Sequence, residues 1–424
     1  MTDIIDELTW RGLIALTTDL DGLREALDAG PVTLYGGFDP TAPGLHIGNL
    51  VLLLTMRRFQ LAGHRPIALA GGGTGLIGDP GGKQDERALL TREVLDGYLE
   101  GIRSQLALFV DLSDGLLLDN SAWLGTLSTL DFLRDVGKHF TVNQMVAKES
   151  VKSRFDRPDQ GISYTEFSYM LLQAYDFLRL HVDYGCDLQI GGSDQWGNIT
   201  MGVDLVRKVC GDVVWGLTTP LVLKEDGTKL GKTETGNVWL SADRTSPFAL
   251  YQFFVNTPDA MVGTYLRFFT FLSHEEIEAL DAETAEHPGR RAAQRALAGA
   301  VVGLVHGEAE AARCVEASEA LFGEEIAALS EEMLVAITRD APTTEVSRQA
   351  VADGLSLVDA LERSGLVRSR KEARRAIEQG GAYVNNLRET DAARELGPHD
   401  LLHDRYIVVR KGPREIHVLR AGSE

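Results

Sequence analysis

A stripe of polar side chains runs through an otherwise apolar stretch of the sequence, residues 163–180. Tyr169, Gln173 and Asp176 recur at positions i, i+4 and i+7, so on a helix they lie along one face. A carboxylate and an amide on a buried helix are unfavourable unless other groups satisfy their hydrogen bonds. The stripe therefore either pairs with protein groups and water, or lines a cavity that binds a small polar ligand.

Two other segments carry groups that suit phosphate chemistry. His46 and Asn49 are three residues apart at the predicted start of a helix, where backbone N–H groups without helical partners favour an anion. Lys229, Lys232 and Thr233 lie in a glycine-rich loop, and two ammonium groups on a flexible loop can close over a polyphosphate. Taken singly, a histidine near a helix start is more often structural, and a lysine-rich loop is more often a solvated turn.

The glycine-rich segment 71–82 follows a predicted strand and is itself followed by two more cations, Lys83 and Arg87. Its backbone could bind a phosphate, but it lacks the G-x-x-x-x-G-K-S/T spacing of a P-loop. The sequence therefore excludes a Walker-type ATPase.

Composition limits the class of protein. The 424 residues are 44% hydrophobic, so the chain can bury a large core and form two or three domains. It carries 42 basic and 62 acidic side chains, a net charge of −20. Such a charge excludes nucleic-acid binding over the whole surface, so any contact with RNA requires a local basic patch.

The cysteines Cys186, Cys210 and Cys314 are scattered and form no C-x-x-C pair. We therefore expect no protein-bound metal and no disulfide framework, which fits a reducing compartment. The first residues are acidic, unlike an export signal, and no apolar run approaches the roughly 18 residues of a membrane span. These features predict a cytoplasmic protein with no membrane contact.

The order of predicted elements indicates an α/β protein. Two short apolar runs, 32–35 and 67–70, each lead into a glycine-rich segment and then a helical pattern. This repetition predicts a Rossmann-like, doubly wound parallel sheet with helices on both faces. Its ligand should lie at the carboxyl ends of the strands, where Tyr35 and Asp79 are found.

The rest of the chain changes character after the sheet. We predict an α-helical domain over 247–322, an acidic, turn-rich linker over 323–353 and a small α+β module over 354–424, with paired strands at 406–409 and 415–419. The Rossmann-like domain would cover 1–222, and 223–246 would hold the lysine loop and a connection. In the final module, one predicted helix places five basic residues against a single acid: Arg368, Arg370, Lys371, Arg374 and Arg375. Such a run marks either a solvated helix face or an RNA-binding surface.

Six motifs occur in one order along nearly the whole chain: YGGFDPT (35–41), HIGN (46–49), GLIGDP (75–80), QAYD (173–176), GGSDQWGN (191–198) and KLGKT (229–233). Together they resemble the bacterial tyrosyl-tRNA synthetases, a family of class I aminoacyl-tRNA synthetases. The second and last motifs correspond to the HIGH and KMSKS signatures of that class. Asn49 replaces the second histidine of HIGH, and Leu-Gly replaces Met-Ser inside the lysine loop. Asparagine is still a neutral hydrogen-bond donor and both lysines remain, so we expect activity to be retained.

The resemblance assigns a role to each candidate residue. Those implied to bind L-tyrosine are Tyr35, Asp79, Tyr169, Gln173, Asp176 and Gln195, with Tyr35 and Asp176 at the phenol hydroxyl. Those implied to bind ATP and the adenylate are Asp39, Thr41, His46, Asn49, Gly192, Asp194 and Lys232. Those implied to be catalytic are His46, Asn49, Lys83, Arg87, Lys229, Lys232 and Thr233. On a helix the stripe spans about 10 Å, which suits a ligand with an amine at one end and a phenol at the other.

The resemblance also implies the reaction and the partners. ATP, as its Mg²⁺ complex, would activate L-tyrosine to tyrosyl-adenylate and release pyrophosphate, and the tyrosyl group would then pass to the 3′ end of tRNA(Tyr). The C-terminal module is similar to the S-four RNA-binding module found at the end of bacterial tyrosyl enzymes. The family further implies a homodimer, with residues 120–170 as a plausible interface.

Two other functions compete with this interpretation. A tryptophanyl synthetase is disfavoured by the Tyr35 and Asp176 pair and by the C-terminal module. A catalytically idle paralogue that only binds RNA is disfavoured because His46, Asp194 and both signature lysines are intact.

Overall fold

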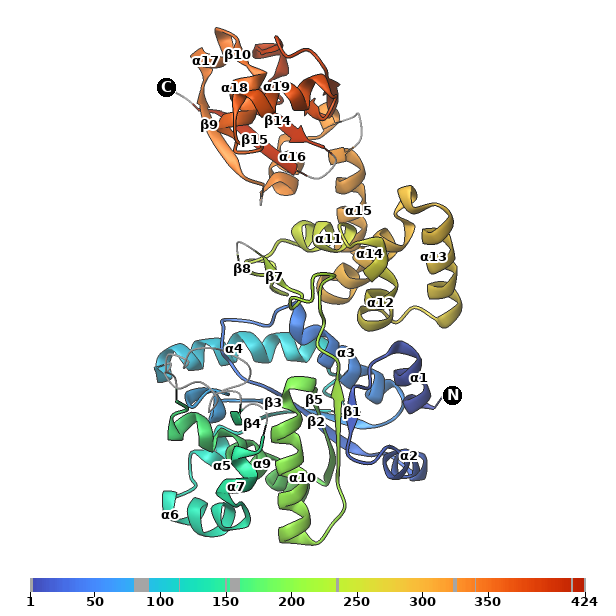
Figure 1. The fold of residues 1–424 in the computed structure, drawn as a ribbon, viewed down its shortest axis with the longest axis vertical. Helices are drawn as coiled ribbons and strands as arrows, with labels where there is room; N and C mark the ends of the chain where they lie inside the picture. Colours follow the sequence, from blue (N-terminus) through green and yellow to red (C-terminus); the bar gives the residue numbers. More distant parts are fainter. Residues whose placement is uncertain are drawn as a thin grey trace. The chain divides into compact units, whose positions relative to one another are not determined.

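The structure is a computed structural model, and it describes residues 3–79, 91–113, 115–148, 151–152, 161–233, 236–322, 326–339, 341–412 and 415–422. The chain forms two compact units (Figure 1). The first comprises Met1–Ser241 and Pro258–Ala282, and the second comprises Ala242–Thr257 and Glu283–Glu424. The predicted helical segment 247–322 therefore contributes to both units.

A six-stranded sheet lies at the centre of the first unit, in the order β1-β6-β5-β2-β3-β4. Its strands are β1 (Leu16–Thr17), β2 (Thr33–Phe38), β3 (Arg65–Ala70), β4 (Leu116–Asp119), β5 (Cys186–Gly192) and β6 (Trp215–Thr219). All neighbours pair in parallel except β1, which is antiparallel to β6 at one edge. The predicted parallel sheet is confirmed, and the predicted strands at 32–35 and 67–70 correspond to β2 and β3.

The strand order reverses between β2 and β5. From β2 the chain proceeds to β3 and β4 on one side, and from β5 it proceeds to β6 on the other. In open parallel sheets, the crevice outside the carboxyl ends of the strands at such a reversal is where ligands bind. Tyr35 of β2 lies opposite Gln189 of β5 at this junction.

Helices pack on both faces of the sheet (Figure 1). On one face, α3 (Ile47–Leu61) and α4 (Arg92–Phe109) contact each other and strands β2, β3 and β4. On the other, α9 (Tyr164–Tyr184) and α10 (Trp196–Cys210) pack together against β5 and β6. Glycines allow close approach: a Cβ at Gly36 would lie 2.9 Å from the sulfur of Met56 in α3, and one at Gly216 would overlap Ile199 of α10.

The helix that carries the polar stripe is α9, which is 21 residues long. It begins after Ser163, whose side chain accepts a hydrogen bond from the backbone N–H of Glu166. It ends at Gly185, which adopts the left-handed conformation (φ 62°) and so stops the helix without a Cβ penalty. Its apolar side, including Phe177, joins Tyr35 of the sheet in one hydrophobic core. The stripe is therefore held on a rigid, buried helix.

The remaining elements of the first unit surround this core. They include α1 (Ile4–Arg11), α2 (Leu20–Ala29), α12 (Asp259–Phe269) and α13 (His274–Glu286), which continues beyond the unit. Short elements are η1 (Thr74–Leu76), α5 (Ser121–Leu124), α6 (Thr129–Asp131), η2 (Phe132–Val136), η3 (Gly137–His139), α7 (Val142–Val146), η4 (Ser193–Gln195), β7 (Lys232–Thr233) and β8 (Gly236–Asn237). Two buried guanidinium groups connect the C-terminal end of α12 to α3 and α1. Arg58 of α3 and Arg11 of α1 donate to the backbone carbonyl of Thr270 at 2.6 and 3.1 Å. Cations at a helix C-terminus are favourable because its last carbonyls lack helical partners.

The second unit combines helices with a small mixed sheet. Its helices are α11 (Pro247–Val255), η5 (Pro288–Arg290), α14 (Ala292–His306), α15 (Glu308–Phe322), η6 (Ile326–Ala328), α16 (Glu331–Thr338), α17 (Arg348–Ala352), α18 (Leu357–Arg363), α19 (Arg370–Glu378) and η7 (Pro398–Asp400). Its five-stranded sheet has the order β12 (Leu387–Glu389), β11 (Ala382–Val384), β14 (Tyr406–Lys411), β15 (Glu415–Gly422) and β9 (Thr343–Ser347). A separate pair joins β10 (Leu355–Ser356) to β13 (Glu395–Leu396). The predicted pairing of 406–409 with 415–419 is confirmed.

Residues 323–353, which we predicted to be a linker, contain regular structure among their described residues. The strand β9 is the edge strand of the five-stranded sheet and pairs in parallel with β15. In the sequence, α16 precedes β9 and α17 follows it. The acidic, turn-rich composition concealed this strand, because its partner is some seventy positions away in the sequence. No helix among the described residues is long and apolar enough to cross a membrane.

Candidate active site

A cavity of about 420 Å³ opens at the carboxyl ends of β2 and β5, within the first unit. Its lining includes thirteen of the residues expected from the sequence to form the site: Tyr35, Asp39, Thr41, His46, Asn49, Asp79, Tyr169, Gln173, Asp176, Gly192, Asp194, Gln195 and Lys229. They come from strands, loops and helices that are up to 194 positions apart in the sequence, so only the fold brings them together. The polar stripe of α9 thus lines a cavity, and its side chains are also hydrogen-bonded to other protein groups.

A carboxylate and a phenol form the floor of the cavity. Asp176 is 2% exposed and Tyr35 is 1% exposed. Asp176 accepts one hydrogen bond on each oxygen, from Asn120 Nδ2 at 2.9 Å and from Trp123 Nε1 at 2.7 Å. The hydroxyl of Tyr35 has no hydrogen-bond partner among the residues that the structure describes. Because buried hydroxyls are almost always hydrogen-bonded, this group is suited to a polar atom of a ligand.

Burial dominates the protonation of both groups. It raises the pKa of Asp176 from 3.8 to about 7, although the hydrogen bonds from Asn120 and Trp123 act in the opposite direction. Burial also raises the pKa of the Tyr35 phenol, with a further contribution from the nearby Asp176. Tyr35 is therefore a neutral hydroxyl over the whole physiological range, whereas Asp176 titrates near neutrality.

A chain of buried hydrogen bonds connects the carboxylate to three other elements. Asn120 also donates to Thr74 Oγ1 at 2.9 Å, and Thr74 donates to Asp39 Oδ1 at 2.7 Å. The second oxygen of Asp39 accepts from the hydroxyl of Tyr169 at 2.7 Å. The path starts and ends on α9 and passes through the ends of β4 and β2, so it fixes the spacing of Asp176 and Tyr169.

A second network holds the amide side chains on the other side of the cavity. Gln195 Nε2 donates to Asp79 Oδ2 at 2.6 Å. Asn198 Nδ2 donates to both Gln173 Oε1 at 3.0 Å and Gln195 Oε1 at 3.1 Å. The position of Gln173 on α9 is thereby tied to that of Gln195 at the start of α10.

The N-terminus of α3 lies at the cavity, and its two signature residues cap the helix. The backbone N–H of Gly48 donates to His46 Nδ1 at 3.0 Å, and the backbone N–H of His46 donates to Asn49 Oδ1 at 3.0 Å. This reciprocal capping box orients both side chains. Because Asn49 uses its carbonyl oxygen for the cap, its amide nitrogen is the atom that can donate to a ligand. The N-terminal end of the helix dipole adds a positive potential suited to phosphate.

The lysine loop supplies one described cation to the cavity. Lys229 Nζ lies 3.2 Å from Asp194 Oδ2, and both side chains are partly exposed. Gly231 adopts a positive φ of 89° next to the cavity wall, which suits a sharp turn. Lys232 and Thr233 form the short strand β7, which pairs with β8; only their backbone is described. Lys83 and Arg87 lie outside the described residues.

Four polar residues of the site were missed from the sequence: Thr74, Asn120, Trp123 and Asn198. Asn120 directly follows β4, so the rule that placed Tyr35 and Asp79 at carboxyl ends of strands could have found it. Asn198 closes the GGSDQWGN motif that was already noted. Trp123 gave no signal, because nothing in its local sequence indicates that its indole N–H reaches α9.

The five basic residues predicted for RNA contact lie on or beside α19 in the second unit: Arg368, Arg370, Lys371, Arg374 and Arg375. All five are exposed, while Ala373 and Ile377 of the same helix are buried. Arg370 pairs with Asp359 at 2.9 Å, and Glu372 pairs with Lys411 at 2.9 Å. The helix thus presents an apolar side to its domain and a basic side to the outside.

Comparison with known sequences identifies the family. A family model described as tRNA synthetases class I (W and Y) matches residues 27–323, and one described as a tyrosine–tRNA ligase C-terminal domain matches residues 333–419. A tyrosine–tRNA ligase of Roseiflexus castenholzii is 55% identical over 99% of this chain and 100% of its own length. The chain belongs to the tyrosyl-tRNA synthetase family. A relative of the same name from Thermobifida fusca is 52% identical, over 98% of this chain and 99% of its own length.

Solved structures agree with this assignment. A truncated mitochondrial tyrosyl-tRNA synthetase of Aspergillus nidulans has a TM-score of 0.69 and 33% identity, and covers 76% of this chain and 95% of its own. A tryptophanyl-tRNA synthetase of Plasmodium falciparum is also similar, with a TM-score of 0.54 at 12% identity over 78% of this chain and 87% of its own. The fold alone does not separate the two specificities, but the C-terminal domain and the relatives above 50% identity do. The predicted family, fold class and enzyme class are confirmed.

The raised pKa of Asp176 predicts a specific dependence of stability on pH. The folded chain disfavours the ionised carboxylate, so the stabilising contribution is complete below the ordinary pKa of 3.8 and is lost as pH rises through about 7. Asp176→Asn removes this titration. The free energy of unfolding of the wild type, relative to the variant, should fall by about 4 kcal/mol from about pH 4 to about pH 8. Urea denaturation at a series of pH values measures this difference.

Asp183→Asn serves as the matched control for this measurement. Asp183 lies on the same helix, but it is exposed and pairs with Arg179 at 2.6 Å. This variant should keep the pH dependence of the wild type. A difference between wild type and Asp176→Asn that stays constant with pH would contradict the assignment of a raised pKa to Asp176.

Proposed function

We propose that this chain activates L-tyrosine with ATP and transfers it to tRNA(Tyr). The names of the relatives that match over their whole length support this function. The single structural observation that carries the proposal is the buried pair of Tyr35 and Asp176 at the floor of the cavity. A phenol hydroxyl of the ligand can donate to the Asp176 carboxylate and accept from the Tyr35 hydroxyl, so it satisfies both groups at once.

The remaining groups around the cavity suit the other end of tyrosine. Tyr169, Gln173 and Asp79 line the cavity and carry oxygen atoms that suit the ammonium group. Gln195, which is tied to Asp79 and Asn198, suits the carboxylate side of the amino acid. Because these groups are held by the two hydrogen-bond networks, little reorganisation is needed when the ligand binds.

The chemistry of activation requires positioning and positive charge rather than a general base. The attacking carboxylate is already ionised at neutral pH, and the leaving group is pyrophosphate, which ATP brings to the site with its own Mg²⁺. His46 and Asn49 at the helix terminus suit the phosphates, together with Asp39, Thr41 and Gly192 around the nucleotide. Asp194 suits the ribose. The cations Lys229, Lys232, Lys83 and Arg87, with Thr233, would neutralise the charge that develops on the phosphoryl oxygens.

Lys229 is paired with Asp194, and its ammonium group lies 3.2 Å from the carboxylate. A triphosphate carries more negative charge than one carboxylate, so it competes for the lysine and leaves Asp194 to accept hydrogen bonds from ribose hydroxyls. Breaking the Lys229–Asp194 ion pair costs little free energy because both side chains are partly exposed.

The second step requires that tRNA reaches the adenylate, and the basic helix α19 suits this contact. The chain carries a net charge of −20, so binding must rely on a local surface of this kind. A protein of this function works where tRNA and ribosomes are found, and we propose a cytoplasmic location for it.

A homodimer is part of the proposal. Four large apolar side chains are exposed on α6, η2, α7 and the first residue of α9: Leu130 at 78%, Leu133 at 47%, Val142 at 64% and Tyr164 at 71%. Exposed apolar groups gathered in one segment are typical of a protein–protein interface. They fall within residues 120–170, the segment that the sequence suggested as the interface.

Tyr35→Phe tests the recognition of the phenol hydroxyl. The variant should lose one neutral hydrogen bond to tyrosine, so its preference for tyrosine over phenylalanine should fall by about 3- to 10-fold. The preference is measured as the ratio of kcat/KM in pyrophosphate exchange with each amino acid. Tyr175→Phe is the control, because Tyr175 belongs to the same core but is absent from the cavity lining. An unchanged ratio in Tyr35→Phe, or exchange driven best by tryptophan, would overturn the proposed substrate.

Arg374→Gln combined with Arg375→Gln tests the RNA-binding surface. Loss of two phosphate contacts should lower the kcat/KM for tRNA charging by about tenfold or more and make its salt dependence shallower. Tyrosine-dependent pyrophosphate exchange should stay unchanged. The control, Arg405→Gln with Arg420→Gln, removes two exposed charges from the same module, one just before β14 and one in β15, so the net charge is equal. Equal losses in the two double variants would contradict a specific role for α19.

Leu130→Asp combined with Tyr164→Asp tests the dimer. Two carboxylates buried in a symmetric interface would be unpaired, so the dimer should dissociate at concentrations where the wild type stays associated. Sedimentation equilibrium measures the mass. Leu112→Asp is the control, because Leu112 is 47% exposed but lies outside the proposed interface. A wild-type chain that sediments as a monomer would exclude the dimer.

A further inference from the structure

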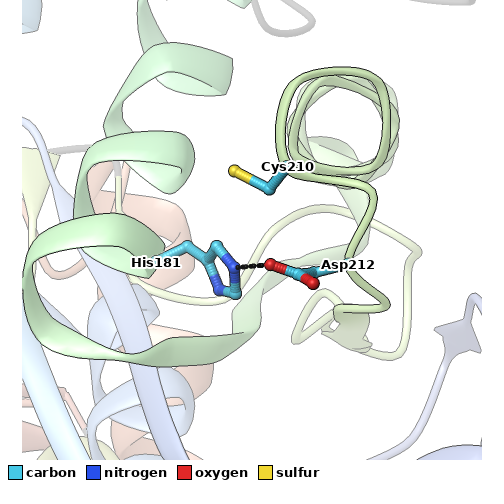
Figure 2. Close-up of side chains that lie close together, drawn as sticks. All are labelled: His181, Cys210 and Asp212. Atoms are coloured by element: carbon cyan, nitrogen blue, oxygen red, sulfur yellow. Dashed lines mark hydrogen bonds and ion pairs between the residues drawn. The ribbon is translucent and has the colours of Figure 1, made fainter.

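Three potential metal ligands, His181, Cys210 and Asp212, lie close together (Figure 2). His181 lies in the last turn of α9, just before β5, and Cys210 and Asp212 lie at the end of α10, before β6. These positions are at the amino ends of the two strands, whereas the cavity lies at their carboxyl ends. The cluster is therefore separate from the proposed active site, and none of the proposed reaction steps uses it.

The three ligand atoms lie within 4.8 Å of one another. His181 Nε2 is 3.1 Å from Asp212 Oδ2, and the sulfur of Cys210 lies beside them (Figure 2). Gly211, which follows the last residue of α10 and precedes Asp212, adopts a positive φ of 80°. This turn brings Asp212 back towards α9, so a side chain from each side of the turn reaches the same point. Donor atoms around one Zn²⁺ lie about 3 to 4 Å apart, which a small rotation of the exposed Cys210 side chain can satisfy.

The environment of His181 orients its ring for metal binding. Its Nδ1 lies 2.9 Å from Asp187 Oδ1 and 3.3 Å from the backbone carbonyl of Cys186. A carbonyl oxygen can only accept, so Nδ1 carries a proton, and Nε2 is the atom that faces Cys210 and Asp212. A histidine whose other ring nitrogen donates to a carboxylate or carbonyl is the usual arrangement behind a metal ligand.

Nε2 and Asp212 Oδ2 can share either a proton, which makes an imidazolium–carboxylate pair, or a metal ion. The proton pair involves only His181 and Asp212, whereas a metal ion would also engage the sulfur of Cys210, which lies within 4.8 Å of the other two ligand atoms. An imidazole, a thiolate and a carboxylate are the three ligand types that Zn²⁺ takes in proteins.

We propose that His181, Cys210 and Asp212 bind a Zn²⁺ ion, with a fourth position left to water. Asp187 holds the imidazole in place and is not itself a ligand. The ion links the C-terminal ends of α9 and α10, and so it stabilises the helix pair that carries the polar stripe. The proposal differs from the expectation of no protein-bound metal, which rested on the absence of a C-x-x-C pair.

Binding of Co²⁺ to the metal-free, full-length protein tests the proposal directly, because a thiolate bound to Co²⁺ gives a charge-transfer absorption band. The wild type should take up one Co²⁺ with this band, and Zn²⁺ should displace it. Cys210→Ser should abolish the band, and Asp212→Asn and His181→Gln should each lower the Zn²⁺ affinity by at least tenfold in competition with a chromophoric chelator. Cys314→Ser is the matched control, because this buried cysteine is remote from the cluster in the sequence and should leave both readouts unchanged.

The unfolding temperature tests whether Zn²⁺ stabilises the helix pair, as we propose. Excess Zn²⁺ should raise the unfolding temperature of the wild type and of Cys314→Ser, but not that of Cys210→Ser. Cys210 and Asp212 are exposed, so their variants should fold and keep tyrosine-dependent pyrophosphate exchange. The proposal is overturned if the wild type binds no Co²⁺, if the charge-transfer band survives in Cys210→Ser, or if the cluster holds only a protonated imidazole that Zn²⁺ does not displace.

Discussion

A carboxylate that is removed from water is the constraint on which the rest of the first unit depends. Asp176 is 2% exposed, and burial of a charge in an apolar core is tolerated only when donors replace the lost water. Asn120 and Trp123 provide these donors; Asn120 directly follows β4, and Trp123 lies in the next helix, α5. The sheet edge must therefore lie beside α9, and the hydrogen bonds that continue to Thr74, Asp39 and Tyr169 extend the same requirement to β2 and β3.

Much of this arrangement is predictable from the residues alone, because it follows from periodicity and from chain order. The spacing of Tyr169, Gln173 and Asp176 predicted one polar face, and strands that each led into a glycine-rich turn predicted a parallel sheet with its site at the carboxyl ends. The features that we did not predict depend on interactions with partners that are distant in the sequence. Trp123 acts on a residue 53 positions away, and β9 was taken for a linker because its composition is typical of a turn while its partner β15 ends the chain.

The cysteine positions likewise show that sequence spacing alone does not reveal every possible metal site. Spacing rules recognise pairs of ligands on one local loop, such as C-x-x-C, and they are silent when ligands come from the ends of two helices. Cys210 and Asp212 are two residues apart, but His181 lies near them only because α9 and α10 pack side by side and both end near the amino ends of β5 and β6. A set of ligands that is brought together by helix packing can be recognised only from the three-dimensional structure.

The two clusters on α9 illustrate how one helix can serve separate purposes without conflict. Its middle turns carry the stripe that lines the cavity, and its last turn carries His181 near the amino end of β5. Gly185 ends the helix immediately afterwards, so β5 starts at a defined position and delivers Gly192 and Asp194 to the cavity. A contact that holds the C-terminal end of α9 therefore acts on the site through the geometry of β5 and α9, and not through its charge. Such an effect would change the stability of the folded unit before it changed the chemistry of the reacting atoms.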